Sequence, residues 1–251
     1  MDHLSRIRAS VLLLVATFPL LPSGTSAQQG SGQGFLFKQP TIQLGLRGGY
    51  TVARAGGPVL DFARNELTLN KRDFDASSWG LELAVRAQER LDIAFDVRFS
   101  KSEVGSEMRD WEDQDGLPIQ QTTTFVRVPI TVSAKFYFRD RGRAISRFVW
   151  IPEKWAPFLG AGGGFAWYRF KQAGDFKDAL SFDILSLTLE SSGAAPTAHV
   201  FAGVDVSISP RFLWTVEARY ALSGADTGSA FDFDNIDLSG FQATIGISAR
   251  F

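Results

Sequence analysis

The sequence predicts an all-β fold, an eight-stranded antiparallel transmembrane up-and-down β-barrel. Three observations predict it. Apolar and polar residues alternate along eight segments. Tight turns and long connections alternate between those segments. No segment beyond the N-terminal region offers about 18 consecutive uncharged apolar residues, so helices are not expected to cross a bilayer.

The composition excludes several classes of function. The 251 residues hold 26 Lys and Arg against 27 Asp and Glu, so no bulk positive field would attract a nucleic acid. There is no cysteine, which removes disulfides, thiolate metal sites and cysteine nucleophiles. With only two histidines as well, the sequence predicts no metal site and no cofactor.

The N-terminal region reads as an export signal. Arg6 and Arg8 precede an apolar run over 11–21, and Thr25, Ser26 and Ala27 supply small residues for cleavage. We therefore expect a signal peptide over 1–27. A flexible leader rich in Gln, Gly and Ser follows over 28–39, and the barrel occupies 40–251.

Eight alternating segments form the expected barrel. They are 41–50, 79–87, 91–100, 126–138, 158–168, 197–208, 214–220 and 240–251. Long connections at 51–78, 101–124, 171–196 and 221–239 fall on one rim. A further connection from Arg139 to Lys154 lies on the short-turn rim, where its apolar residues could line an interface: Ile145, Phe148, Val149 and Trp150.

The apolar faces are expected to point outward. A barrel of about eight strands has just enough interior for side chains, and five or six large residues per strand would overfill it. The opposite faces carry small residues and charges that we expect to pair in the lumen: Arg47, Glu82, Arg86, Asp92, Asp96, Arg98, Arg127, Lys135, Asp205, Glu217, Arg219 and Arg250. Aromatic girdles are expected at Tyr50, Trp79, Phe99, Trp167 and Tyr220 on one side, and at Phe136, Phe138, Trp155, Trp214 and Phe251 on the other.

With these features the chain resembles the small eight-stranded outer-membrane barrels of Gram-negative bacteria, the OmpA-transmembrane, OmpX and OmpW type. The stretch from Pro157 to Gly164 and the last strand, Gly240 to Phe251, carry the closest likeness. The resemblance implies the bacterial outer membrane, contact with its lipid and lipopolysaccharide, and recognition by the barrel-assembly machinery through the strand ending in Phe251. It also implies a monomer without a peptidoglycan-binding domain.

His199 is the one imidazole in the expected mature chain. Some barrels of this kind deacylate lipid A with a His-x-Ser pair, but Phe201 stands where the serine would be. Although Glu217 could orient the ring, we expect His199 to be a lumen residue bonded to Asp205 or to another polar neighbour. No catalytic residue is predicted.

Acidic clusters mark two of the long connections: Asp110, Glu112, Asp113 and Asp115 in one, and Asp232, Asp234 and Asp237 in the other. The first does not complete an EF-hand, because Trp111 and Thr122 would occupy its first and last ligand positions. Solvated loops are the plain interpretation, with weak divalent bridging to lipopolysaccharide as the alternative.

Two further patterns are local. Gly160-x-Gly162 is no dinucleotide motif, since Phe165 takes the third glycine position; these glycines are expected to relieve crowding or bend the strand. Pro129 lies inside a predicted strand without a backbone donor, so we expect a bulge and an interrupted ladder there.

The function predicted from the sequence is an integral outer-membrane barrel with a plugged polar lumen, structural or adhesive through its surface loops, and not an enzyme. Three alternatives remain open at this point: a lipid A-modifying enzyme, a narrow conduit for small apolar solutes, and a secreted lipocalin-like binder.

Overall fold

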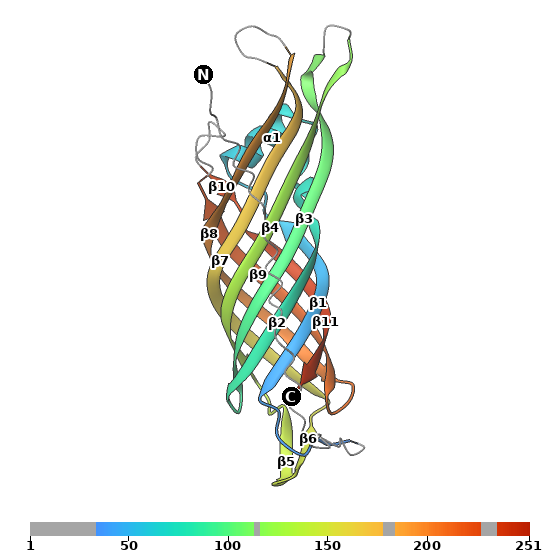
Figure 1. Cartoon of the computed structure of the whole chain (residues 1–251), viewed down its shortest axis with the longest axis vertical. Coiled ribbons are helices and arrows are strands. Elements are labelled where there is room, and N and C mark those ends of the chain that lie inside the picture. Colours follow the sequence, from blue (N-terminus) through green and yellow to red (C-terminus); the bar gives the residue numbers. More distant parts are fainter. Residues whose placement is uncertain (1–33, 113–115, 178–183, 227–234) are drawn as a thin grey trace, which may run out of the picture.

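A closed ring of eight antiparallel strands dominates the computed structural model, which describes residues 34–112, 116–177, 184–226 and 235–251 (Figure 1). The order around the ring is β1-β2-β3-β4-β7-β8-β9-β11, and β11 pairs with β1 to close it. The strands are β1 (Ile42–Ala53), β2 (Ala76–Gln88), β3 (Leu91–Glu112), β4 (Pro118–Tyr137), β7 (Trp155–Lys177), β8 (Ile184–Ser207), β9 (Phe212–Ala225) and β11 (Gly240–Arg250). The predicted fold class is confirmed. The predicted signal peptide over 1–27 lies outside the described residues.

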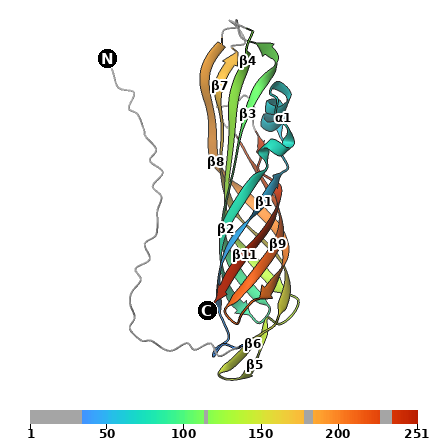
Figure 2. The same cartoon turned by 90° about the vertical axis from the view of Figure 1, so that its right-hand side faces the viewer.

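Short elements occupy the two ends of the barrel. At the end with the long connections lie helix α1 (Pro58–Glu66), the 3₁₀ turn η1 (Lys71–Phe74) and strand β10 (Ile236–Asp237). The hairpin of β5 (Gly142–Ser146) and β6 (Val149–Pro152) lies at the other end, where the C-terminus also lies (Figure 2). None of the helices in the described part of the chain combines the length and apolar character needed to cross a bilayer.

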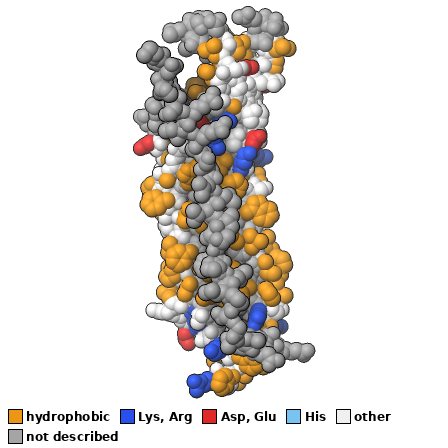
Figure 3. All heavy atoms as spheres, in the orientation of Figure 1, with side chains coloured by type: hydrophobic (Ala, Val, Ile, Leu, Met, Phe, Trp, Pro, Cys, Tyr) orange, Lys and Arg blue, Asp and Glu red, His pale blue; other side chains and the backbone are white. Residues whose placement is uncertain are grey.

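The apolar faces point outward, as predicted. Leu83, Phe95, Val132 and Ile245 keep between 40% and 53% of their side-chain surface exposed, whereas Lys135 is fully buried in the lumen. Apolar side chains therefore gather over the barrel wall, with charged side chains towards both ends (Figure 3). A barrel with an apolar interior, as in the lipocalin-like alternative, is not the fold of this chain.

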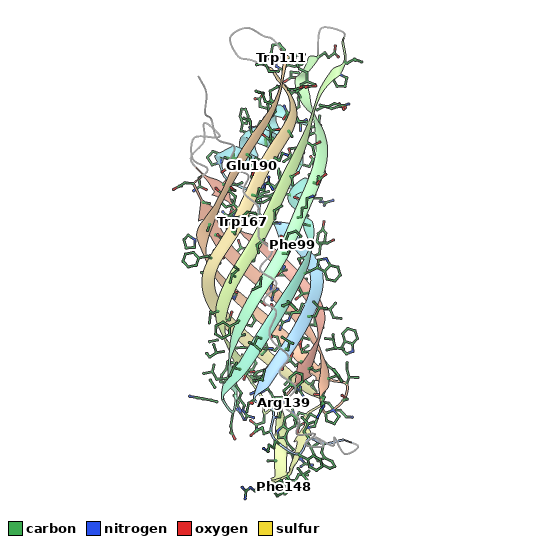
Figure 4. All side chains as sticks on the ribbon, viewed as in Figure 1. Phe99, Trp111, Arg139, Phe148, Trp167 and Glu190 are labelled. Atoms are coloured by element: carbon green, nitrogen blue, oxygen red, sulfur yellow. The ribbon has the colours of Figure 1, made fainter. Side chains whose placement is uncertain are left out.

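Aromatic side chains ring both ends of this apolar band. All ten of the predicted girdle residues are exposed. Phe99 and Trp167, on β3 and β7, project from the wall near the upper end of the band (Figure 4). Such rings are typical of the two interfaces of a membrane-spanning barrel.

Two of the long connections, 101–124 and 171–196, consist largely of strand where loops were predicted. Residues 101–112, 118–125, 169–177 and 184–196 of β3, β4, β7 and β8 continue the ladder above the ring, and we call these four segments the extension. In the connection over 51–78, α1 and η1 follow the end of β1. The prediction of loops was wrong for the extension because large apolar side chains such as Phe125 and Phe170 face inward there, opposite to the pattern in the barrel.

The ladder is interrupted at Pro129, but without a bulge. Between β3 and β4 the pairing runs to Val97 opposite Ile130 and resumes at Ser100 opposite Arg127. The register is the same on both sides of this gap, so no residue is inserted and the predicted bulge was wrong. On its other side, β4 stays continuously paired with β7. The missing N–H of proline explains a break that needs no extra residue.

The hairpin β5–β6 only partly matches the predicted interface. Ile145 and Phe148 are exposed, with Phe148 at its tip (Figure 4). Trp150 is buried, and its backbone exchanges two hydrogen bonds of 2.8 Å with Leu36 from the segment before β1. The hairpin thus holds part of the expected leader segment against the barrel.

Candidate functional site

Charged side chains meet across the middle of the lumen. We call six of them the ion network: Arg47, Glu82, Asp96, Arg98, Glu217 and Arg219. Arg98 lies 2.6 Å from Asp96 (Nε to Oδ1) and 2.7 Å from Glu217 (Nη2 to Oε1). Arg219 contacts the same two carboxylates at 3.2 and 3.1 Å. Strand alternation aims these side chains inward, but the pairing across the lumen follows from the register.

Arg47 completes this network. Its guanidinium pairs with both Glu82 and Glu217, so the Glu217 carboxylate holds three arginines. Arg98 also donates to Gln242 on β11, which ties the network to the strand that closes the ring. Three guanidinium groups thus face three carboxylates, and the ion network is electrically neutral.

A second layer lies towards the short-turn end. Lys135 Nζ is 3.4 Å from Asp205 Oδ2 and 3.8 Å from Glu82 Oε1. Asp205 also accepts hydrogen bonds from Tyr137 at 2.8 Å and Thr215 at 2.7 Å. Because both oxygens of this buried carboxylate accept hydrogen bonds and a cation lies beside it, the layer meets the condition under which buried charge is tolerated.

Three aromatic rings fill the space around Lys135, and we call them the aromatic layer: Tyr137, Phe158 and Phe201. The Lys135 ammonium lies 3.8 Å from the Phe158 ring centroid. Glycine makes the room for these rings, since a Cβ on Gly160 would come within 2.2 Å of Phe201 Cζ. The prediction that Gly160 relieves crowding is confirmed. Sequence reasoning missed the aromatic layer, because each of its rings is a single large residue on a strand face that otherwise carries small or polar residues.

Three lumen arginines are exceptions to the predicted pairing: Arg127, Arg250 and Arg86. Arg127 and Arg250 are buried, yet neither forms an ion pair in the part of the chain that the structure describes. Arg250 lies 5.7 Å from the Trp150 ring at the short-turn end, and Arg127 lies 4.9 Å from the Phe125 ring at the other. The expectation that each charge finds an acidic partner was wrong here, because the nearest acids serve other groups. Arg86, at the rim, donates to the Gln88 carbonyl.

His199 points into the lumen and bonds to a hydroxyl. Its Nε2 lies 2.9 Å from the Oγ of Ser133 on β4, which is separated from β8 by β7. The predicted polar neighbour is therefore present, but it is Ser133 and not Asp205. Glu217 is fully engaged by arginines and does not orient the imidazole. No described carboxylate bonds to His199, so the arrangement lacks the acid of a catalytic triad.

The acidic clusters do not form a cage in the described residues. Asp110 and Glu112 are exposed, and Asp237 pairs with Arg54 at 3.6 Å and accepts from the Ser239 N–H. Asp113, Asp115, Asp232 and Asp234 lie outside the described residues. Within those residues no group of three or more potential metal ligands converges.

A cavity of about 60 Å³ lies in the lumen above the ion network, and we call it the chamber. Arg98, Arg219 and His199 line its floor, and Leu238 and Ser223 contribute from the end with the long connections. Phe99 and Pro129, which lie in the unpaired gap between β3 and β4, also line the chamber. The chamber therefore reaches the wall where β3 and β4 are not paired.

The extension has its own apolar core. The rings of Phe74, Phe125 and Phe170 meet edge to face, with centroids 6.4 and 5.9 Å apart. Residues from α1 and β10 pack against them, among them Leu60 and Ile236. Figure 2 shows α1 against one face of the extension. This core covers the chamber from above.

The outer face of the extension is polar. Lys101 pairs with Glu103 at 2.5 Å, and Arg169 pairs with Glu190 at 2.7 Å. A side-chain hydrogen bond from Lys101 lowers the pKa of Glu103 below its ordinary value. Above the girdle, polar groups thus replace the lipid-facing apolar groups on the same strands.

The two edges of the extension differ. On β3, the segment after α1 covers the edge: Leu67 pairs with Met108, and Thr68 donates to the Glu107 carbonyl at 2.9 Å. On β8, pairing with β9 begins only at Thr197, and the strand pairs described for residues 184–190 are with β7 alone. In the described part of the chain, the edge of β3 is therefore covered, whereas no strand pair covers the outer edge of residues 184–190 of β8.

The chain matches no protein-family model, and comparison with curated protein sequences finds no match. Solved structures of small outer-membrane barrels resemble it at low identity. Neisserial surface protein A has 13% identity and a TM-score of 0.45, with 84% of this chain and 96% of that one covered. OprG of Pseudomonas aeruginosa has 10% identity and a TM-score of 0.44, with 85% and 98% covered. The N-terminal barrel of OprF from the same species has 11% identity and a TM-score of 0.40, with 85% and 98% covered.

Proposed function

We propose that the chain is an integral protein of the bacterial outer membrane, with a closed lumen and a structural or adhesive role at the cell surface. The observation that carries the proposal is the outward apolar band between two aromatic girdles, around an interior of buried ion pairs. Lipid is the one solvent in which that exterior is favourable. Short turns face the periplasm and longer segments face outward in such barrels, so the extension projects from the cell.

The closed lumen rests on the ion network and the aromatic layer. Side chains from all eight strands of the ring enter these layers or bond to them. A planar-bilayer recording of the purified protein tests this: we expect no large, steady conductance. Arg98→Ser with Arg219→Ser, which removes two guanidinium groups from the network, serves as the comparison and is expected to conduct more. A large steady conductance of the unaltered protein would refute the closed lumen.

Residues 184–190 of β8 support the surface role. The strand pairs that the structure describes for them are with β7 alone, and a strand with one such edge can accept an extended peptide as an additional strand. Leu185 and Leu187 are exposed along this segment. We expect Leu187→Lys to reduce attachment of cells that display the protein, whereas Thr122→Lys, on the central strand β4, leaves attachment unchanged. Equal attachment by both variants and the unaltered protein would refute the adhesive role of this edge.

A narrow conduit for small apolar solutes is a second candidate, favoured by the contact of the chamber with the interrupted ladder. Because the chain has no cysteine, Phe99→Cys with Val128→Cys can link β3 to β4 across the gap without competing disulfides. Slower uptake of an apolar solute by cells with the linked protein, restored by a reductant, would favour the conduit. Unchanged uptake would oppose it.

The lipid A-modifying alternative has less support. The His199–Ser133 pair faces the lumen and lacks an acidic partner among the described residues. Partners of the chain remain proposals too: lipid and lipopolysaccharide around the apolar band, and the barrel-assembly machinery at the strand that ends in Phe251. We also retain the prediction of a monomer and of no enzymatic activity.

A further inference from the structure

Arg127 enters the chamber as a buried cation that has no ion-pair partner among the residues that the structure describes. Its side chain is 5% exposed. Nη2 donates to the Phe74 carbonyl at 3.2 Å, the guanidinium lies over the Phe125 ring, and Nε has no hydrogen-bond partner. An uncompensated buried charge is costly, so a site of this kind favours a counter-ion.

The acids of the described residues form no ion pair with Arg127. Below Arg127, the three carboxylates of the ion network already balance three arginines. The nearest acids above are Asp75 and Asp237. Asp75 accepts the Ala53 N–H at 2.8 Å, and Asp237 holds Arg54 and the Ser239 N–H. Among the described residues no carboxylate therefore forms an ion pair with Arg127, and the Asp75 and Asp237 carboxylates act on its charge only from a distance.

The size of the chamber limits what can enter. Its 60 Å³ correspond to about four or five water molecules, which matches the head of a carboxylate or a phosphate and little more. Thr131 also lines the chamber, and its hydroxyl has no hydrogen-bond partner. A guanidinium and a hydroxyl facing one small space are donors suited to a single anionic group.

We propose that the chamber is a binding site for one anionic group, a carboxylate or a phosphate, held by the Arg127 guanidinium. This inference goes beyond the surface role proposed above and does not depend on it. The group has two sources. One is a small free anion. The other is the head group of an amphiphile whose tail stays in the lipid, since the chamber reaches the wall beside Phe99 and Pro129.

His199 offers a reporter inside the same chamber. The chain has only two histidines, His3 and His199, so ¹⁵N-histidine labelling gives at most two imidazole sets in an NMR spectrum. The experiment titrates the full chain, purified in a non-ionic detergent, with acetate as the free anion and with decanoate as the amphiphile. The His199 set is assigned by its loss in His199→Gln.

Two arginine variants make a matched pair. Arg127→Gln removes the cation from the chamber. Arg250→Gln removes an equally buried unpaired arginine, 4% exposed, at the opposite end of the lumen. We expect saturable shifts of the His199 signals in the unaltered protein, an at least ten-fold weaker response in Arg127→Gln, and a response within two-fold of the unaltered protein in Arg250→Gln.

The two probes separate the sources. An Arg127-dependent response to both acetate and decanoate supports a free anion, and a response to decanoate alone supports an amphiphile. The proposal is overturned if neither probe gives a saturable shift, or if Arg127→Gln responds like the unaltered protein. Heat-modifiable gel migration checks folding. Should Arg127→Gln not fold, Arg127→Lys is expected to bind several-fold more weakly, because an ammonium lacks the bidentate fork, and an unchanged affinity would overturn the proposal.

Discussion

Four of the eight barrel strands, β3, β4, β7 and β8, continue into the extension, where apolar side chains such as Phe125 face inward and not outward. Along β4, Val132 faces outward and Lys135 inward within the barrel, whereas Thr122 faces outward and Phe125 inward in the extension. On β7 the change falls between the outward Trp167 and the outward Arg169. The hydrophobic effect favours apolar groups away from water in both regions, so the solvent around each strand segment decides which face is apolar.

The largest expected effect comes from the interior of the barrel. Glu217→Ala leaves three buried arginines without a shared carboxylate, and breaking a buried ion pair typically costs about 3–5 kcal/mol. Urea unfolding in lipid vesicles measures this loss in the free energy of unfolding. Glu190→Ala is the control, because its exposed pair with Arg169 contributes about 1 kcal/mol or less. Equal losses in both variants would contradict the contrast between interior and exterior charges.

An effect of similar size is expected in the extension, but confined to it. Phe125→Ala empties the space between Phe74 and Phe170, and such truncations cost about 3–5 kcal/mol. Hydrogen exchange should accelerate over 101–112 and 169–176 while the barrel stays protected. Phe165→Ala, on the lipid-facing side of β7, should leave exchange in the extension unchanged. Faster exchange throughout the barrel would show that the two regions do not behave separately.

The outer face of one strand gives a direct test of the change of solvent. Val132→Arg places a charge in the middle of the apolar band, at an expected cost of about 2–4 kcal/mol near the bilayer midplane. Thr122→Arg lies on the same face of β4 within the extension and should be nearly neutral. Unfolding free energies in vesicles compare the two. If Val132→Arg left the free energy of unfolding unchanged, the outer face of β4 at Val132 would not lie in the hydrocarbon of the bilayer.

The smallest effect concerns an exposed pair of the extension. Lys101 lowers the pKa of Glu103, so their contact is present above the ordinary pKa of a glutamate and is lost as the pH falls through the lowered value. Lys101→Gln should move the pKa of Glu103 back up towards its ordinary value. A carboxyl NMR titration measures this, and an unchanged pKa would contradict the contact.

Much of the fold could be predicted because strand alternation is a local signal. The eight strands, the outward side chains such as Phe95, and the girdle position of Trp167 all follow from period-two patterns in short segments. The extension was missed at residues 101–124 because its alternation has the opposite phase and a mostly polar outer face. A search for strands with an apolar outer face therefore takes these residues for a loop.

The candidate site was less predictable. Arg127 and Lys135 occupy equivalent inward positions on β4. Nothing local to either residue indicates that, within the described residues, Lys135 forms ion pairs and Arg127 forms none. Likewise, the sequence allowed Asp205 or another polar neighbour as the partner of His199, and the structure places Ser133 there.

The sequence by itself determined how many strands there are, which side of each strand faces lipid, and where Pro129 weakens the ladder, because these properties depend on the residues within one strand. Only the tertiary structure decided which charges meet, that Phe158 and Phe201 share the lumen with Lys135, and that α1 and β10 cover the chamber. Those contacts join residues far apart in the chain, and they depend on the register and closure of the whole ring.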